Sequence, residues 1–481
     1  MAITEEKAKG RFYTPGHIVR SILNMSGYRG PGILRRHAID NSCGDGAFLD
    51  EMVRRYSAEA VKAGYSGAEL ARDLGTYIHG LEIDGAETAK AAARITETAR
   101  RYGAAGVRWD VRCGNTLTET RYDGKMDFVL GNPPYVRVHH LADAYDAVKR
   151  YRFSRAGMTD IFITFYEIGL NMLRPGGTLG YITPSSLFHS RAAADLRRHL
   201  ADGGLIRAVA DLKHYQPFEA TTYTAIMILR KGDSGRAASV RYFGYDPAGE
   251  TERFVCRLTR GEFEIGGNFY FGPKRALARL GRILNVPARY PGLDVKNGFA
   301  TLLDSFFIGD LPFSEYVIPV VKASTGKSSK CLFPYDRSGQ PVPFARLGKN
   351  RLIAARYREY EARLRGRSLT DPDRWYGFGR TQGISDVYKR KYSVCPIIRT
   401  PEDLKITFCG EGVGVYGGLY ILTDLDRRTI EDALLTEDFM EYVALLGKYK
   451  SGGYYTFSSK DLKRYLVWKL SETAGREPSA L

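Results

Sequence analysis

Short apolar runs alternate with longer segments of helical spacing through the first half of the chain. The apolar runs predict strands at residues 37–40, 77–82, 107–112, 127–131, 178–183, 206–212 and 224–230. The helical spacing predicts helices at residues 47–56, 86–101, 160–173 and 191–200. This alternation is typical of a doubly wound α/β sheet, in which ligands bind beyond the carboxyl ends of the strands.

The alternation stops after the predicted strand at residues 224–230. A polar stretch covers residues 231–239, and one last strand-like run follows at residues 240–245. Beyond it the spacing is irregular and rich in Gly, Tyr and Arg. We therefore expect a first domain over residues 1–245 and a second, mixed α+β domain over residues 246–481.

A glycine-rich turn lies between the first predicted strand and the helix that follows it. Its candidate binding residues are Asp40, Cys43, Gly44 and Gly46. Glycines let a backbone approach a ligand closely, and a helix amino end supplies free N–H groups. The turn has neither the G-x-G-x-x-G pattern of dinucleotide sites nor the G-K-[ST] ending of a phosphate loop. An ordinary structural turn is the alternative.

Glu82 and Asp84 follow the second predicted strand. An acidic side chain at this point of a nucleotide-binding sheet accepts hydrogen bonds from both hydroxyls of a ribose. The glycine turn and this acidic pair make each other more credible, and together they predict a site for a nucleoside cofactor.

Asn132, Pro133, Pro134 and Tyr135 come directly after the apolar strand at residues 127–131. Two prolines fix an extended turn and remove two backbone donors, so nearby carbonyls stay available as acceptors. The Asn132 side-chain oxygen and the Pro133 carbonyl could hold an amino group, and Tyr135 offers a flat aromatic face beside them. The alternative is an ordinary Pro-Pro turn with a surface tyrosine.

The sequence NPPY after the fourth strand, with DNSCGDG after the first and LEID after the second, resembles the N6-adenine DNA methyltransferases of type II restriction-modification systems. The order of motifs is similar to the γ-type, TaqI-like group over nearly the whole chain. The resemblance implies a class I methyltransferase sheet of the Rossmann-like, doubly wound kind, followed by a target-recognition domain. It also implies S-adenosyl-L-methionine as the cofactor.

The resemblance further assigns cofactor-binding residues. Phe12, Tyr13, Thr14 and Pro15 stand where the family has an F-x-T-P segment that covers the cofactor. The glycine turn with Asp40 would lie under the cofactor, Glu82 would bind its ribose, and Asn132 would border it. Cys113, Gly114 and Asn115 would flank its adenine, although the family usually has Asp where Asn115 stands.

For catalysis, the resemblance implies that a flipped adenine stacks between Tyr135 and Phe218 while Asn132 and Pro133 bind its amino group. Asp160 would open a helix that borders the cofactor pocket. Stacking on an aromatic side chain contributes roughly 1–3 kcal/mol per base, comparable to the cost of extruding a base. A core position is an equally good explanation for Phe218.

Charge and composition fit this interpretation. The net charge is +17, from 71 Lys and Arg against 54 Asp and Glu, which favours a polyanionic partner, although charge alone does not distinguish nucleic acid from a membrane surface or simple solubility. The resemblance implies that this partner is double-stranded DNA. Residues 346–391 are basic and contain interleaved aromatics, Tyr357, Tyr360, Trp375, Tyr376, Phe378 and Tyr388. That stretch as a whole suits a surface that follows phosphates. For each aromatic taken singly, a core position is the better explanation.

Several expectations concern what the protein lacks. The six cysteines are scattered without a C-x-x-C pair, so we expect no zinc site. No apolar run has membrane-spanning length, and the first residues lack a secretory pattern, so we expect no membrane partner and a cytoplasmic, nucleoid-associated prokaryotic protein. We also expect a monomer, and a cognate restriction endonuclease that is encoded separately.

Two other classes share some of these features. Methyltransferases that act on protein glutamine or on guanine in RNA also carry NPPY, but they are usually shorter and lack a long basic second domain. A nucleic-acid-binding protein that has lost catalysis is disfavoured by the intact DNSCGDG, LEID and NPPY motifs. The preferred hypothesis is methyl transfer from S-adenosyl-L-methionine to N6 of a flipped adenine in a specific DNA sequence.

Overall fold

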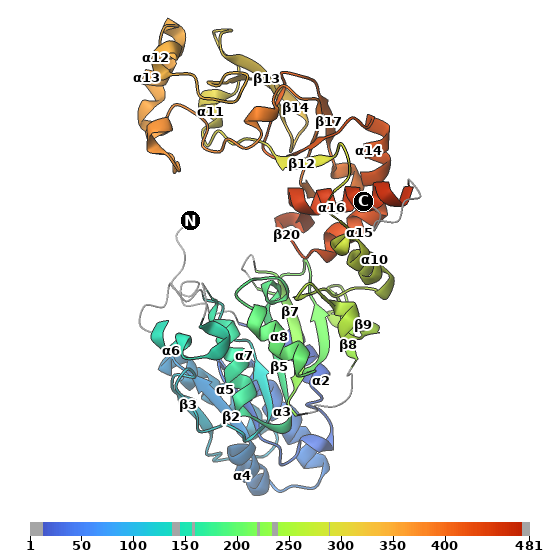
Figure 1. Cartoon of the computed structure of the whole chain (residues 1–481). Helices are drawn as coiled ribbons and strands as arrows, with labels where there is room; N and C mark the ends of the chain where they lie inside the picture. The colour runs from blue at the N-terminus through green and yellow to red at the C-terminus, as the bar shows by residue number, and fades with distance from the viewer. Residues whose placement is uncertain are drawn as a thin grey trace. The chain divides into compact units, whose positions relative to one another are not determined.

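The computed structural model describes residues 13–136, 145–155, 159–218, 222–232, 239–287 and 289–473. The chain divides into two compact units, and the division falls between Leu277 and Ala278 (Figure 1).

One long sheet organises the first unit, with the strand order β3-β2-β1-β4-β5-β7-β6-β8-β9. Strands β7 and β9 run antiparallel to their neighbours, and the other neighbouring pairs are parallel. The strands are β1 (Ala38–Asp40), β2 (Ile78–Glu82), β3 (Asp110–Cys113), β4 (Met126–Gly131), β5 (Leu173–Pro184), β6 (Ile206–Asp211), β7 (Thr224–Arg230), β8 (Val240–Asp246) and β9 (Thr251–Leu258).

Helices cover both faces of this sheet. Gly180 of β5 faces the first helix, because a Cβ there would collide with Ser26 Oγ, whereas Leu179 and Tyr181 face Gly169 of α7. The helices of the first unit are α2 (Gly16–Met25), α3 (Ala47–Lys62), α4 (Gly67–Tyr77), α5 (Gly85–Arg101), α6 (Tyr145–Lys149), α7 (Ile161–Met172), α8 (Ala194–Asp202) and α9 (Arg260–Phe263). Residues of α2, α3, α4 and α5 share one apolar cluster with alternate residues of β6 and β7.

The predicted doubly wound α/β class is confirmed, and each predicted strand and helix of the first half has a counterpart. The boundaries differ at several ends: β3 begins at Asp110 rather than at residue 107, and β5 begins at Leu173 rather than at residue 178. Helices α2 and α4 and strand β9 were not predicted. Strand β9 contains only a short apolar run, at residues 254–256, and most of its side chains are exposed at the edge of the sheet.

The predicted domain boundary near residue 245 falls inside β8, so the division of the chain lies later than the sequence indicates. Strand β8 pairs with β6, and β9 pairs with β8, which makes both part of the first unit's sheet. A short hairpin of β10 (Glu264–Ile265) and β11 (Asn268–Phe269) follows, and α10 (Lys274–Asn285) contains the division. The polar stretch before β8 therefore falls within the first unit, and its residues 233–238 lie outside the described residues.

The second unit combines small sheets with helices. Its strands form the sheets β12-β19-β15-β17, β14-β13-β18 and β16-β21-β20. Their bounds are β12 (Asp294–Asn297), β13 (Val317–Lys322), β14 (Lys327–Leu332), β15 (Lys391–Val394), β16 (Ile397–Ile398), β17 (Ile406–Cys409), β18 (Gly414–Tyr416), β19 (Leu419–Leu422), β20 (Tyr449–Lys450) and β21 (Tyr454–Thr456). The helices are α11 (Asp304–Phe307), α12 (Phe344–Leu347), α13 (Arg351–Arg365), α14 (Arg427–Leu434), α15 (Glu437–Leu445) and α16 (Ser459–Thr473).

The aromatics of the basic stretch belong to the core of this unit. Tyr357, Trp375 and Phe378 are buried, and Tyr360, Tyr376 and Tyr388 pack against the same apolar cluster. The core explanation is therefore the correct one for each of them. None of the helices in the described part of the chain is long and apolar enough to cross a membrane.

Candidate active site

The carboxyl ends of β1 and β4 meet at the centre of the candidate site. The two strands are parallel neighbours, with Ile39 opposite Val129. Asp40 ends β1, and a Cβ added to Gly131 at the end of β4 would lie 2.5 Å from Asp40 Oδ1. Ser42 Oγ donates to the backbone carbonyl of Asn132 at 3.3 Å. The glycine turn and the NPPY turn are thus in direct contact.

Asp40 carries a buried carboxyl group with only 1% of its surface exposed. Burial raises the pKa of Asp40 to about 8, and the nearby charges of Glu82 and Asp45 act in the same direction. The backbone N–H of Ser42, which donates to Oδ1 at 3.0 Å, partly opposes this shift. A carboxyl group in this state changes charge near neutral pH.

Glu82 is held in place by the glycine turn. Its Oε2 accepts a hydrogen bond from the backbone N–H of Gly44 at 2.9 Å, and its Oε1 accepts one from the backbone N–H of Asp84 at 3.0 Å. A carboxylate offers about four acceptor positions. Each oxygen of Glu82 therefore keeps acceptor capacity for a hydroxyl group.

The rest of the glycine turn is shaped by close packing. Gly44 and Gly46 both have positive φ, +49° and +86°, and a Cβ at Gly46 would lie 2.9 Å from Ala91 of α5. Cys43 donates its backbone N–H to the carbonyl of Leu81 at 2.9 Å. Burial raises the pKa of the Cys43 thiol, which therefore stays protonated and is a poor nucleophile.

Asp84 has a structural role that accounts for it without a ligand. It is the N-cap of α5, and its side chain accepts from the backbone N–H groups of Ala86 at 2.9 Å and Glu87 at 3.3 Å. Of the two acidic residues expected to bind cofactor, Glu82 is thus the one whose carboxylate is presented by the strand end.

The segment expected to cover the cofactor reaches the NPPY turn. Thr14 is buried, and its Oγ1 accepts a hydrogen bond from Asn132 Nδ2 at 3.1 Å. Pro15 is the N-cap of α2, and Tyr13 is 47% exposed, with its hydroxyl donating to Glu87 at 3.3 Å. Phe12 lies outside the described residues. The Thr14 contact turns the nitrogen of the Asn132 amide toward α2, so that its oxygen lies on the other side of the amide.

The segment after β3 is also tied to this edge of the sheet. Gly114 donates its backbone N–H to the carbonyl of Glu82 at 2.8 Å. Cys113 and Asn115 are exposed, and Asn115 Oδ1 accepts from the backbone N–H of Leu117 at 3.0 Å. Asn115 thus directly follows a residue whose backbone is hydrogen-bonded to Glu82, and its side-chain oxygen is engaged in a local turn.

The NPPY turn itself is tightly packed. Pro133 is buried and Pro134 is half-buried. The hydroxyl of Tyr135 donates to the carbonyl of Ile182 at 3.0 Å, and burial raises the pKa of Tyr135 well above its usual value. Asp160 is the N-cap of α7, and the Ile161 N–H donates to the Val136 carbonyl at 3.0 Å, which joins the turn to this helix.

Phe218 lies beside Tyr135 but not parallel to it. Their ring centroids are 6.2 Å apart with an interplanar angle of 74°, and Phe162 contacts Tyr135 in a similar edge-on way at 6.4 Å. A base held between two rings needs parallel planes about 7 Å apart, twice the contact distance of carbon atoms. Phe218 is also only 8% exposed, so in this arrangement it packs as a core residue.

Several residues around the site gave no signal in the sequence. Phe162 lies in an apolar run of α7, where one more aromatic is unremarkable. Asn41, although part of the DNSCGDG motif, has no role indicated by the sequence; it is buried and forms hydrogen bonds with Tyr181, Thr116 and Met172. His17 and Tyr215 join the segment after Thr14 to the loop before Phe218, with 2.8 Å between His17 Nε2 and the Tyr215 hydroxyl. Only the three-dimensional arrangement identifies these contacts.

Sheet order and site position together define a class I methyltransferase fold. Known proteins agree with this class. The family model of the Eco57I restriction-modification methylase matches residues 85–218. The solved structure of the type IIL restriction-modification enzyme MmeI in complex with DNA has a similar fold, with a TM-score of 0.61 at 14% identity, over 92% of this chain and 63% of that one.

Curated relatives include two type II methyltransferases. M.BstVI of Geobacillus stearothermophilus is 31% identical over 46% of this chain. The matched part covers only 42% of that relative's length. M.XhoI of Xanthomonas vasicola is 25% identical over 96% of this chain and 91% of its own length. Residues 85–218 are similar to the Eco57I restriction-modification methylase, and the resemblance to restriction-modification methyltransferases that the sequence predicts is confirmed at this level. The cofactor predicted from the sequence, S-adenosyl-L-methionine, agrees with the similarity to these methyltransferases.

The Asp40 carboxyl group generates a prediction about stability. Its folded pKa of about 8 lies above the value of about 3.9 for an unfolded chain, so ionisation of Asp40 destabilises the fold. The free energy of unfolding should fall by about 1.4 kcal/mol per pH unit between about pH 4 and about pH 8 from this group alone. The Asp40→Asn variant should lack this component in urea unfolding measured without ligand.

The matched control is Asp45→Asn, which removes a carboxylate of the same turn that pairs with Arg94 at 2.9 Å. The difference between Asp40→Asn and the unchanged protein should widen as the pH rises to about 8 and then level off. If the two proteins gave parallel curves across this range, the raised pKa of Asp40 would be excluded.

Proposed function

We propose that this chain transfers the methyl group of S-adenosyl-L-methionine to N6 of a flipped adenine in a specific double-stranded DNA sequence. The observation that supports this most directly is the contact of the NPPY turn with the glycine turn, through Ser42 and Asn132. The NPPY turn, which offers acceptors for an amino group, thus lies beside the glycine turn, where a nucleoside could bind. The first unit would be catalytic, and the second would recognise the target.

The residues around Glu82 fit the cofactor. Its carboxylate keeps acceptor capacity for the ribose hydroxyls. A Cβ added at Gly44 would have no atom within 4 Å, so the space beside this glycine is open and a ligand can approach its backbone. Asp40 lies at the end of the neighbouring strand β1, where a cationic ligand would favour its ionised form. S-adenosyl-L-methionine supplies the methyl group as a sulfonium when bound.

The chain's own residues would then act by holding the amino group. The Asn132 side-chain oxygen and the Pro133 carbonyl accept hydrogen bonds from the two N–H groups of the adenine amino group. These bonds weaken the conjugation of the amino nitrogen with the base and free its lone pair. The hydrogen bond from Asn132 to Thr14 fixes the amide for this purpose. The nitrogen forms one bond to the methyl carbon as the sulfonium bond breaks, and one proton leaves to solvent. Positioning and preorganised acceptors supply most of the rate.

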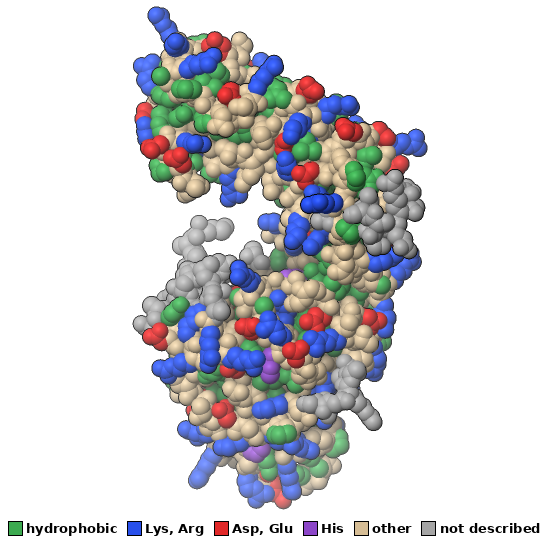
Figure 2. Space-filling model, in the orientation of Figure 1, with side chains coloured by type: hydrophobic (Ala, Val, Ile, Leu, Met, Phe, Trp, Pro, Cys, Tyr) green, Lys and Arg blue, Asp and Glu red, His purple; other side chains and the backbone are tan. Residues whose placement is uncertain are grey.

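DNA as the substrate is supported by charge and by the second unit. Lys and Arg side chains are spread over the visible face of each unit, with Asp and Glu among them (Figure 2). On α13, Arg351 and Arg358 are exposed seven residues apart, which places them on one side of the helix. Neither has an ion-pair partner among the described residues. Arginines of this kind neutralise phosphates and give salt-dependent affinity.

The test of this function uses Asn132→Ala and tritiated S-adenosyl-L-methionine. Unmethylated genomic DNA, RNA and protein are offered separately, and label is expected in DNA alone. Asn132→Ala should lower turnover on DNA by at least about a hundredfold, because an acceptor used in the transition state is lost. The cofactor Kd, measured by calorimetry, should stay within about twofold.

Thr14→Val serves as the matched variant, since it removes only the hydroxyl that orients Asn132. It should lower kcat by a smaller factor, about tenfold, and Thr14→Ser should restore activity. Label in RNA or protein but not in DNA would replace the proposed substrate. Loss of cofactor binding in Asn132→Ala, with normal turnover per bound cofactor, would refute its catalytic role.

Phe218 provides a second prediction. If the ring rotates to stack on the extruded adenine, Phe218→Leu should lower kcat/KM for DNA by about 5- to 150-fold, the equivalent of 1–3 kcal/mol of stacking. Phe218→Tyr keeps the aromatic face and should retain most of the activity. A core role predicts the reverse order, because leucine conserves an apolar volume and tyrosine adds a buried hydroxyl. The melting temperatures of both variants separate lost stacking from lost stability.

A further inference from the structure

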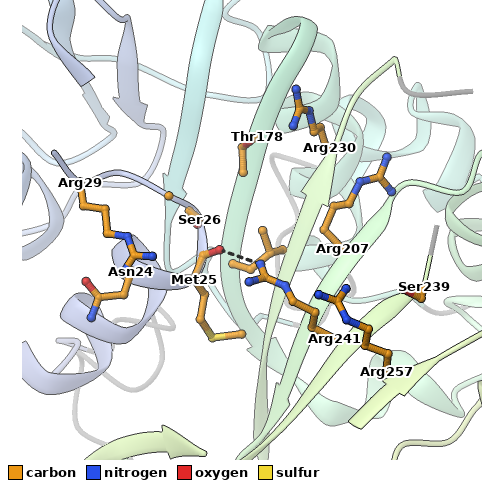
Figure 3. A pocket seen from close by; sticks show the side chains of 12 residues that line it. Asn24, Met25, Ser26, Arg29, Thr178, Arg207, Arg230, Ser239, Arg241 and Arg257 are labelled. Carbon is orange, nitrogen blue, oxygen red and sulfur yellow. Dashed lines mark hydrogen bonds between the residues drawn. The ribbon is translucent and has the colours of Figure 1, made fainter. Parts of the chain in front are cut away.

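A cavity of about 290 Å³ lies in the first unit, away from the strand ends that carry the NPPY turn, and it is lined by five arginines. They are Arg29, Arg207, Arg230, Arg241 and Arg257. Arg207 and Arg241 stand near the amino ends of the parallel strands β6 and β8, whereas the candidate active site is at carboxyl ends. Figure 3 shows Arg29 on one side of this cavity and Arg241 and Arg257 on the other.

The register of the sheet gathers these charges. Arg241 of β8 lies directly opposite Arg257 of β9, and Arg230 of β7 lies opposite Thr178 of β5. Like charges directly opposite each other on neighbouring strands destabilise a sheet. The Arg241–Arg257 pair is therefore a cost to the fold unless something between the guanidinium groups offsets it.

The surrounding protein offsets only part of this charge. None of the described residues that line the cavity carries a carboxylate. Arg241 Nη2 donates to the carbonyl of Met25 at 3.5 Å, at the carboxyl end of α2, which contributes about half a negative charge. Within the described ranges, the side chains of Arg29 and Arg257 have neither an ion pair nor a hydrogen bond to an acceptor.

Two further observations fit a site for an anion. Burial lowers the pKa of Arg241, and the positive charges of Arg257 and Arg29 lower it further. Ser26, another lining residue, is 8% exposed, and its Oγ has no hydrogen-bond partner among the residues the structure describes. A buried hydroxyl and converging guanidinium groups are all hydrogen-bond donors for an anion.

We propose that Arg29, Arg241 and Arg257 form a binding site for a compact anion with two or more adjacent phosphate groups. Guanidinium groups bind phosphate oxygens through paired N–H donors, and three of them exceed the charge of a single phosphate. The cavity volume is at the lower end for small-molecule sites, so it suits a pyrophosphate group rather than a large ligand. Such a group occurs in free nucleoside polyphosphates, and the phosphates of a nucleic-acid backbone offer similar chemistry.

The test measures pyrophosphate binding to the full chain by isothermal titration calorimetry at physiological ionic strength. Arg29→Gln and Arg257→Gln should each raise the Kd by about tenfold or more, because each removes a charged hydrogen-bonding group. Both side chains are exposed, so the melting temperature should be retained. Orthophosphate should bind about tenfold more weakly than pyrophosphate if two phosphate groups are held.

The matched control is Arg253→Gln, on the same strand as Arg257 but paired with Asp246 at 3.2 Å. Its pyrophosphate Kd should change by less than about twofold. No saturable binding by the unchanged protein, or equal weakening in Arg253→Gln, would overturn the proposed site.

Competition with a short DNA duplex separates the two sources of the anion. If the site takes backbone phosphates, the duplex displaces pyrophosphate, and Arg257→Gln lowers duplex affinity and the salt dependence of binding. If it takes a free polyphosphate, duplex affinity is unchanged in the same variant. Either result supports the site. Because these readouts do not involve methyl transfer, they stand or fall independently of the proposed activity.

Discussion

The close approach of Asp40 to Gly131 is the constraint on which the candidate site depends. Parallel pairing of β1 with β4 brings two strand ends together, and the absence of a side chain at Gly131 leaves room for a carboxyl group. From there the Ser42 hydroxyl reaches the Asn132 carbonyl, and Asn132 reaches Thr14. Three segments that are distant in sequence, before α2, after β1 and after β4, are thus fixed around one point.

The carboxyl groups of Asp40 and Glu82 lie at neighbouring strand ends but in different electrostatic environments. A carboxyl group buried with few donors is costly in its ionised form, which is why the pKa of Asp40 is raised to about 8. Glu82, in contrast, accepts two backbone N–H groups at the adjacent strand end. Under the proposed function a cationic methyl donor would offset the charge of Asp40, so that cofactor binding and ionisation of this group would favour each other.

The sequence predicted the first unit well because its strands are apolar and its helices amphipathic. It also placed the glycine turn, Glu82 and the NPPY turn at the ends of strands, where the structure has them, while their roles stay predictions. It did not distinguish Asp84 as a helix cap from a ligand, since an acidic residue before a helix suits both roles. The domain boundary was placed too early because the polar sequence at residues 231–239 resembles a linker, and β9 contains only a short apolar run.

Contacts between distant segments were beyond prediction. Nothing in the local sequence indicates that Phe162 lies beside Tyr135, or that His17 lies beside Tyr215. The arginine cavity is another example, because its residues come from a helix end and from strands that the sheet order brings side by side. Single arginines on separate strands look like ordinary surface charges until the register is known.

The central claim is that the NPPY turn presents an adenine amino group to the methyl donor. Its most direct measurement is mass spectrometry of nucleosides from DNA methylated by the purified protein, with S-adenosyl-L-methionine labelled in its methyl group. Label is expected in N6-methyldeoxyadenosine. Label confined to N4-methyldeoxycytidine, or to no nucleoside at all, would contradict it.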